Sequence, residues 1–387
     1  MIGKERCLIL ICLVLLTGCS GVKNIQDLSY IVAVGMDYDE EKEEYAVYLQ
    51  GLNFANVAKQ EGGKPVEPVP IFIATATGET LNLAVSELYR KSEPPLYFGH
   101  VRTLVLTSRL IQRKSEEVLE EVGRNRSFRP TLRIFTTEDD IQDVLNVPAL
   151  FNYPAIYTVL FKEKMGLEAQ DELRSTSMMF FLRDYYEPMG AAIIPSVKID
   201  QGSWKADKDY SILFLNGYSA FQHQEYKKEI PLENAIFINW LLEKKVSLDQ
   251  RVEKEGDLIA AVKLGEPKMK IKYEKTANKP KFSIEISVSG DLLEKLQEDL
   301  TLDTLKKQIE EDIKAKVESI YYDGVENKLD ILNVGEKWYR KHPKEYQKLK
   351  ESPNFYLNEE SLTEVKVKAQ ILHFNSYKFN RSIDGEF

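Results

Sequence analysis

Residues 282–289 carry a strict two-residue alternation, which limits the fold of this chain more narrowly than any other feature. Every second residue is apolar, and each is followed by a serine or a glutamate; the apolar members are Phe282, Ile284, Ile286 and Val288. Because successive side chains of a strand point to opposite faces, the pattern predicts a strand with one buried and one solvated face. Segments 269–273 and 365–371 alternate in the same way. Together they predict a sheet near the C-terminal end.

A long helical pattern lies between these strands. Its apolar residues recur at spacings of three and four: Leu302, Leu305, Ile309, Ile313, Val317 and Ile320. This period places them on one face, which predicts a helix covering one side of the sheet. A second helical stretch, 329–349, contains Pro343, where we expect a kink or a new helix start. Residues 256–387 are therefore expected to form a C-terminal domain of a sheet and long helices.

The first half of the chain alternates predicted strands with predicted helices. The expected strands are 27–37, 44–53, 69–77, 100–107 and 131–137, and the expected helices are 80–91, 115–125 and 138–145. Residues 147–187 are predicted to be helical in two pieces. This order indicates an N-terminal mixed α/β domain with a helical tail, residues 26–187.

A smaller middle domain is expected at 188–255. It contains predicted strands at 191–199 and 210–221 and a predicted helix at 232–245, and the charged segment 253–257 is the expected joint. The expected fold class is α/β (mixed α+β), with three domains, each a mixed or antiparallel sheet with covering helices.

The N-terminus is typical of a cleaved lipoprotein signal peptide. Lys4 and Arg6 precede ten apolar residues, 7–16, too few for a spanning helix of about 20 residues but suited to a secretory signal. The tetrad Leu16-Thr17-Gly18-Cys19 matches the lipobox of bacterial lipoproteins. We expect cleavage between Gly18 and Cys19, with diacylglycerol on the Cys19 sulfur and a further acyl group such as palmitate. Residues 1–18 are then the signal peptide, and 19–25 a lipidated tether.

Cysteine use and charge restrict the chemistry of the mature chain. Cys7 and Cys12 leave with the signal, so only Cys19 remains, and neither a disulfide nor a cysteine-based metal site is expected. The formal charge of −9 becomes −10 after removal of residues 1–18, from 50 basic and 60 acidic residues. Polyphosphate and anionic headgroups repel such a chain, so we expect no nucleic-acid partner. Membrane lipid is expected to hold the protein through Cys19.

Catalytic and metal-binding patterns are absent from the sequence. The histidines are far apart, at 100, 223, 342 and 373, and neither a Gly-x-Ser-x-Gly elbow nor a phosphate loop is present. We therefore predict no catalytic residue, no metal site, no cofactor and no enzymatic activity. A lysine cluster, Lys263–Lys281, faces either an acidic surface or, as we favour, solvent along a strand edge.

Several segments, in order along the mature chain, resemble the Ger(x)C family, the lipoprotein subunits of spore-germination nutrient receptors. They are DL at 27–28 with VGMD at 34–37, GETLNLA at 78–84, YFGHVRTLVL at 97–106, RNRSFRPTLRI at 124–134, NGYSAF at 216–221 and DILNVGEKWYRKHPKEY at 330–346. The chain departs from the family after the lipidated cysteine. There SGVKN (20–24) replaces the usual Trp-Asp and Arg-Glu.

The resemblance implies a non-enzymatic receptor subunit on the outer face of the spore's inner membrane. It implies membrane-embedded receptor subunits as partners, and it leaves open which nutrient triggers the response and whether this subunit binds it. The main alternative is a solute-binding lipoprotein of a nutrient transporter, which requires two similar lobes around a deep cleft. A cell-wall hydrolase is the third possibility, but the sequence lacks the catalytic carboxylate pair or Ser/His set that it requires.

Overall fold

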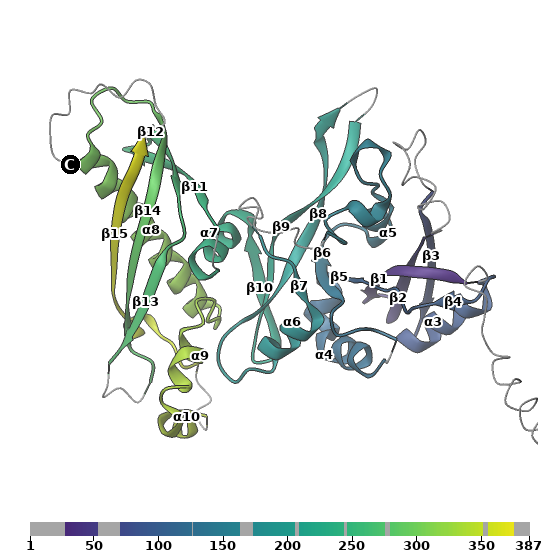
Figure 1. The fold of residues 1–387 in the computed structure, drawn as a ribbon. Coiled ribbons are helices and arrows are strands. Elements are labelled where there is room, and N and C mark those ends of the chain that lie inside the picture. Colours follow the sequence, from purple (N-terminus) through teal and green to yellow (C-terminus); the bar gives the residue numbers. More distant parts are fainter. Residues whose placement is uncertain are drawn as a thin grey trace, which may run out of the picture.

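Two mixed sheets form the framework of the molecule, one in each half of the chain (Figure 1). The computed structural model describes residues 28–52, 70–125, 127–162, 173–205, 209–243, 246–274, 279–350 and 355–374. The predicted mixed α+β class is confirmed. The residues of the expected signal peptide and tether, 1–25, lie outside the described residues.

The first sheet has ten strands, with the main order β10-β9-β8-β6-β5-β1-β2-β3. Its centre, β8-β6-β5-β1, is parallel, and antiparallel pairs flank it on both sides. The short strands β4 and β7 pair with β1 and β6. The strands are β1 (Ser29–Asp39), β2 (Glu44–Leu52), β3 (Phe72–Gly78), β4 (Leu96–Tyr97), β5 (Thr103–Thr107), β6 (Arg133–Thr137), β7 (Thr176–Ser177), β8 (Ala192–Lys205), β9 (Asp209–Gln222) and β10 (Glu225–Pro231).

Helices cover both faces of this sheet. One face carries α3 (Leu81–Arg90), α4 (Ser108–Arg124) and α6 (Met178–Tyr185), and the other carries α5 (Ile141–Asn146). Side chains cap three of the four helices at their first turn, from Thr80, Thr107 and Asp140, where they satisfy backbone N–H groups that lack an intrahelical partner. The strand–helix alternation of the first half is thus explained by a sheet buried on both faces.

The second sheet has the order β11-β12-β14-β13, and β15 pairs with β14 in parallel. Its strands are β11 (Leu248–Lys254), β12 (Asp257–Leu264), β13 (Lys268–Tyr273), β14 (Phe282–Lys295) and β15 (Leu362–Phe374). The long helix α8 (Leu302–Glu326) packs on one face, as its apolar period predicts. Five of its six periodic residues lie in the core, and the first, Leu302, is half-buried. The alternating residues of β14 are buried in the same core. Two short helices follow, α9 (Val334–Tyr339) and α10 (Pro343–Leu349), so Pro343 starts a new helix.

Helix α7 (Leu232–Leu242) joins the two halves. It packs against β9 and β10 of the first sheet and against β11 of the second. The Trp240 indole is fully buried and donates a hydrogen bond to the Gly265 carbonyl at 2.8 Å. One hydrophobic core therefore runs from the edge of the first sheet through α7 into the second sheet.

The observed strand pairing differs from the expected domain boundaries. Thr136 of β6 pairs with Ser196 of β8, so the first sheet continues across the expected boundary at 187/188. Residues 253–257 close the β11–β12 hairpin, with Glu255 and Gly256 at positive φ, so the expected boundary at 255/256 falls inside a turn. The strands β10, β11 and β12 were not predicted from the sequence, and without them these segments resembled connections.

The expected first helical piece after residue 147 is also corrected. Two 3-10 turns occupy its place, η2 (Leu150–Asn152) and η3 (Ala155–Tyr157), and α6 alone matches the second piece. Pro148 and Pro154 interrupt the segment, because proline removes a backbone donor and restricts the residue before it. A further 3-10 turn, η4 (Glu359–Ser361), leads into β15.

Candidate functional site

The lipidation site expected at Gly18 and Cys19 lies outside the described residues. The described chain begins at Leu28, directly before β1. The structure shows a second feature, a cluster of hydrogen-bonded side chains that is buried where the two halves of the molecule meet. It was not predicted from the sequence.

The turn after α8 places this cluster. Lys328 adopts a left-handed conformation (φ 53), and the Leu329 N–H bonds the Gly324 carbonyl at 2.7 Å. With the Lys328 N–H on the Val325 carbonyl, this is the Schellman arrangement that satisfies the last carbonyls of a helix. Gly324 is required there, because a Cβ on it would lie 2.5 Å from the Leu329 oxygen. The turn directs Asp330 back toward the first sheet.

Asp330 is almost fully buried, and its carboxylate accepts three hydrogen bonds. The donors are the backbone N–H groups of Val334 (3.0 Å) and Gly335 (2.6 Å), at the start of α9, and the Tyr356 hydroxyl (2.9 Å). Burial raises the pKa of Asp330 to about 6, and the hydrogen bonds from Gly335, Tyr356 and Val334 oppose that rise. The same burial, with the Asp330 charge beside it, raises the pKa of Tyr356 well above 10.

The first sheet is tied to this cluster by four hydrogen bonds. The Gln222 side chain, at the end of β9, accepts from the Asp330 N–H (2.9 Å) and donates to the Tyr356 hydroxyl (3.4 Å). The Gly190 N–H donates to the same hydroxyl at 3.1 Å, and the Ala191 N–H donates to the Asn333 side chain at 2.8 Å. We call Gln222, Asp330, Asn333 and Tyr356, with the N–H of Gly190, the Asp330 node. It fixes the entrance of β8 and the exit of β9 to α9.

A pocket of about 480 Å³ opens beside the node. It is lined by residues of the β9–β10 turn, the end of α8, α10 and Tyr356; the polar members are His223, Glu225, Lys227, Lys328 and Lys350. Lys227 forms an ion pair with Glu225 at 2.6 Å. Lys328 and Lys350 therefore give the pocket lining a net positive charge. Burial and the nearby Lys227 lower the pKa of His223, which favours its neutral form. The pocket can attract a small anion, but it presents no pair of nucleophile and base.

A second buried carboxylate organises the N-terminal half. Asp37, at 4% exposure, accepts hydrogen bonds from Thr107 (2.5 Å) and from the Arg109 Nε (2.7 Å). These residues come from the end of β1 and the junction of β5 with α4. Two of the segments that carry the family resemblance, 34–37 and 97–106, therefore lie in neighbouring parallel strands that end at this ion pair.

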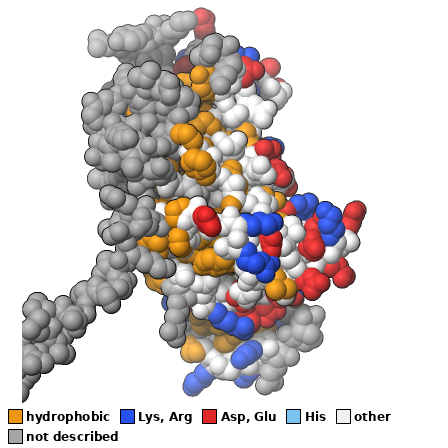
Figure 2. Space-filling model, turned by 90° about the vertical axis from the view of Figure 1, so that its right-hand side faces the viewer, with side chains coloured by type: hydrophobic (Ala, Val, Ile, Leu, Met, Phe, Trp, Pro, Cys, Tyr) orange, Lys and Arg blue, Asp and Glu red, His pale blue; other side chains and the backbone are white. Residues whose placement is uncertain are grey.

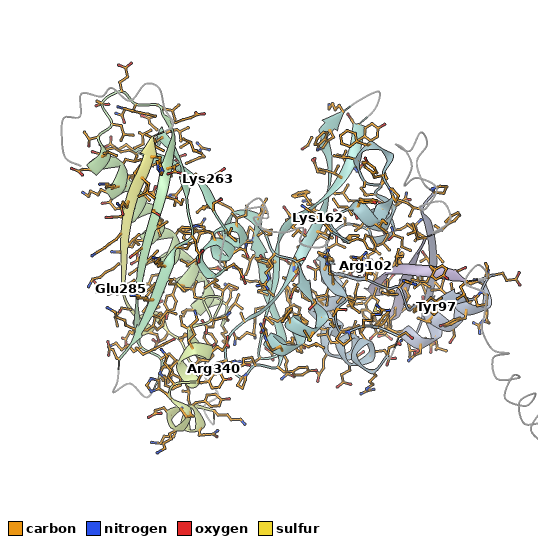
Figure 3. All side chains as sticks on the ribbon, in the orientation of Figure 1. Tyr97, Arg102, Lys162, Lys263, Glu285 and Arg340 are labelled. Carbon is orange, nitrogen blue, oxygen red and sulfur yellow. The ribbon has the colours of Figure 1, made fainter. Side chains whose placement is uncertain are left out.

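The histidines do not converge, and the lysine cluster is spread over several strands. His100 packs against Tyr30 and Tyr97, His342 stacks on Trp338, and His373 contacts Asp291 at 3.0 Å. Among the residues that the structure describes, no group of three or more metal-binding side chains occurs. Lys268, Lys270 and Lys272 lie on the exposed face of the edge strand β13; Lys263, Lys272 and Lys281 pair with acidic side chains. Glu285 and Lys263 mark this sheet in Figure 3.

A sequence signal for the node existed in one place. Asp330 is a lone carboxylate inside the apolar segment LDILNV, 329–334, and a charged residue in such a run is a candidate for buried pairing. Gln222, Asn333 and Tyr356 carry no comparable signal. Within the described part of the chain, no helix is long and apolar enough to cross a membrane.

Comparisons with known proteins agree over nearly the whole chain. The family model described as "Spore germination protein N-terminal domain" matches residues 21–199, and "Spore germination B3/GerAC like, C-terminal" matches 216–375. The chain is 22% identical to spore germination protein KC of Bacillus subtilis over 383 residues, 89% of each protein. It is 21% identical to spore germination protein GerQC of Bacillus cereus over 295 residues, 75% of this chain and 76% of the relative.

A solved structure shares the fold. The crystal structure of the GerBC protein superposes with a TM-score of 0.53, at 16% sequence identity, over 90% of this chain and 100% of that one. The gap between the two family models, 199 to 216, falls within the β8–β9 hairpin.

Proposed function

Because this chain belongs to the Ger(x)C family of spore germination proteins, we propose that it is a lipid-anchored, non-enzymatic subunit of a nutrient receptor that triggers germination. In this proposal it sits on the outer face of the spore's inner membrane, held by acyl groups on Cys19. It acts beside membrane-embedded receptor subunits.

The observation that carries the proposal is the ordered match of both family models over most of the chain. The extent of the likeness to spore germination protein KC adds to it. Among the described residues, the buried carboxylates of Asp37 and Asp330 accept hydrogen bonds from donors of their own fold, which gives both of them a structural role.

The lipid anchor follows from the residues at 16–19 and from charge. An ectodomain with a net charge of −10 (50 basic, 60 acidic) is repelled by anionic headgroups, so adsorption alone does not hold it at a bilayer. Two acyl chains hold a protein stably, whereas one binds marginally and reversibly. Confinement to the membrane surface also raises the effective concentration of membrane partners, to about millimolar for short tethers. Weak contacts with those partners then suffice for assembly.

The anchor is tested by fractionating cells of a sporulating Bacillus host that lacks the partner subunits. Wild type, Cys19→Ala and the matched control Cys12→Ala, which changes a thiol of the signal segment, are compared in washed membranes. We expect wild type and Cys12→Ala in the membranes and the Cys19→Ala protein depleted, because its uncut apolar run of ten residues is short of the ~20 that span a bilayer. Cys19→Ala protein at the wild-type level in these membranes would overturn the anchor.

The partners are tested by co-purification from the same host with the receptor operon restored. We expect the tagged chain to retain membrane-embedded germination subunits after detergent extraction. Retention of transporter subunits in their place would favour the solute-binding alternative.

A further inference from the structure

Aromatic side chains surround the point where the chain enters the fold. Tyr30, the second residue of β1, packs edge-to-face against Tyr97 (5.7 Å between ring centroids) and His100 (5.2 Å). Tyr97 belongs to β4, which pairs in parallel with the first two residues of β1. The Tyr89 ring of α3 extends the cluster through Phe98, at 5.9 Å. Phe72 of β3 lies at the same end of the sheet, because it and Ile31 both pair with Gly51 of β2.

Several aromatic side chains of this cluster are exposed to solvent, unlike those of the hydrophobic core. Tyr97, Tyr89 and Phe72 are 41%, 51% and 58% exposed. Residues 94–98 (PPLYF) are five consecutive apolar residues, of which Pro94, Pro95 and Tyr97 are exposed. Figure 2, which views this end of the molecule, shows hydrophobic side chains gathered in a band, with charged side chains along one side. Exposed apolar patches of this kind mark interaction surfaces. We call Phe72, Tyr89 and residues 94–98 the aromatic end.

The aromatic end lies at the opposite end of the molecule from the second sheet. Figure 1 shows β4 and the start of β1 at one extreme and β13, β14 and β15 at the other. Figure 3 places Tyr97 at that extreme, with Glu285 far away on the second sheet. A planar surface that touches the aromatic end therefore leaves the second sheet remote.

The undescribed chain connects this end to the expected anchor. Eight residues lie between Cys19 and Leu28, and nine Cα–Cα steps join the two (28 minus 19). Fully extended they reach about 30 Å, and as a flexible segment they span about 17 Å. An acyl chain on Cys19 therefore keeps the start of β1 close to the bilayer surface. Tyrosine favours that level of a membrane, where its ring is apolar and its hydroxyl stays hydrated.

We propose that the aromatic end rests on the lipid surface, so that the molecule stands upright with its second sheet held away from the bilayer. This inference rests on the proposed lipid anchor. The occupant is the headgroup–acyl boundary of the membrane, which Pro94, Pro95, Tyr97 and their neighbours enter shallowly. The node, its pocket and the lysines of β13 then face the space above the membrane.

The test uses chemically tethered protein, which separates it from lipidation in cells. The chain from Cys19 onward contains one cysteine, which is coupled to a maleimide-headgroup lipid in phosphatidylcholine vesicles, and coupling is verified by co-flotation. In a Trp204→Phe background, Tyr97→Trp is compared with Tyr322→Trp, a matched change on α8 at similar exposure (41% and 45%). The remaining Trp240 and Trp338 are fully buried. The readout is quenching by lipids brominated near the headgroup.

We expect bromolipid to reduce about twofold the emission that the indole at position 97 adds to that of the Trp204→Phe parent, relative to unbrominated vesicles, because an indole at the interface contacts the acyl boundary. The buried Trp240 and Trp338 emit equally in both kinds of vesicle and are subtracted with the parent. The Tyr322→Trp protein is expected to be unchanged. Quenching at position 322 equal to or above that at 97, or quenching at neither position, overturns the upright orientation. Membrane fractionation of the Cys19→Ala protein tests the lipid anchor separately. The anchor and the upright orientation can therefore be refuted independently.

Discussion

Replacing Tyr356 with phenylalanine removes one oxygen from the Asp330 node and leaves the buried ring in place. The hydroxyl donates to the Asp330 carboxylate at 2.9 Å and accepts from the Gly190 N–H at 3.1 Å. The variant leaves the Gly190 N–H without its acceptor and the carboxylate without one of its three donors. A buried polar group that loses its partner costs about 1–3 kcal/mol. We therefore expect the free energy of unfolding to fall by about 2–4 kcal/mol at pH 7.5.

The size of this effect depends on pH through Asp330. Its folded pKa of about 6 lies above the ordinary value of 3.8, so the folded state binds more protons between these values, and stability falls as pH rises through that window. The Tyr356 hydroxyl stabilises the charged carboxylate, so its loss raises the pKa of Asp330 further. The variant's penalty is consequently smaller at pH 4.5 than at pH 7.5.

Urea unfolding followed by circular dichroism measures both effects. The matched control is Tyr322→Phe, which removes a hydroxyl from an exposed ring on α8 and is expected to change stability by at most about 0.5 kcal/mol. If Tyr356→Phe is as mild as this control, or if its penalty is equal at both pH values, the node does not join the two halves as described.

Two further substitutions test the backbone and the N-terminal ion pair. Gly217→Ala is expected to destabilise the protein by at least about 2 kcal/mol. The reason is that Gly217 has φ +129 and that a Cβ there would lie 2.2 Å from the Ile230 oxygen. The control is Gly123→Ala, which adds a methyl group in open space on α4 and should stabilise the protein by about 0.5–1 kcal/mol. Thermal unfolding that ranks the two variants in the reverse order would contradict the β9–β10 pairing. Asp37→Asn is expected to cost about 1–3 kcal/mol, whereas Glu40→Gln, from an exposed pair with Arg113 at 2.9 Å, is expected to cost about 0.5 kcal/mol or less. Equal denaturant midpoints for these last two variants would show that the buried ion pair contributes no more to stability than the exposed one.

Elements governed by local periodicity were predictable from the sequence. The alternation in β14 and the three-and-four spacing in α8 depend only on which face of one element is buried. The hairpin of β1 and β2, the strands β5 and β6, and the start of α10 at Pro343 were likewise found near their observed bounds. In β14 and α8 one buried face determines the local structure, and at α10 one proline does. β1 and β5 are buried on both faces, and their continuous apolar runs identified them.

The parts that were missed depend on partners distant in the sequence. β11 (LDQRVEK) is rich in charge and β12 (DLIAAVKL) is a short apolar run without alternation. They are strands because they pair with each other and because β12 pairs with β14. The continuation of the first sheet through β6 and β8 pairs Thr136 with Ser196, sixty positions further along the chain (196 minus 136), and only the parallel pairing reveals it.

The node is the extreme case of this dependence. Its hydrogen bonds join Asp330 to Gln222, and Tyr356 to Gly190 across 166 positions. A single sequence holds no local pattern for such a pairing. The lone carboxylate at 330 indicated a buried polar contact but not its partners.

We propose above that this chain is a required subunit of a nutrient germination receptor. The most direct measurement uses spores of a Bacillus host in which every other nutrient receptor operon is deleted and the operon of this chain is the sole one present. Loss of refractility after nutrient addition is compared with the gene present, deleted, and replaced by Cys19→Ala. We expect germination with the wild-type chain, none without it, and a strongly reduced response with Cys19→Ala. Spores that germinate at the wild-type rate without this chain would contradict it.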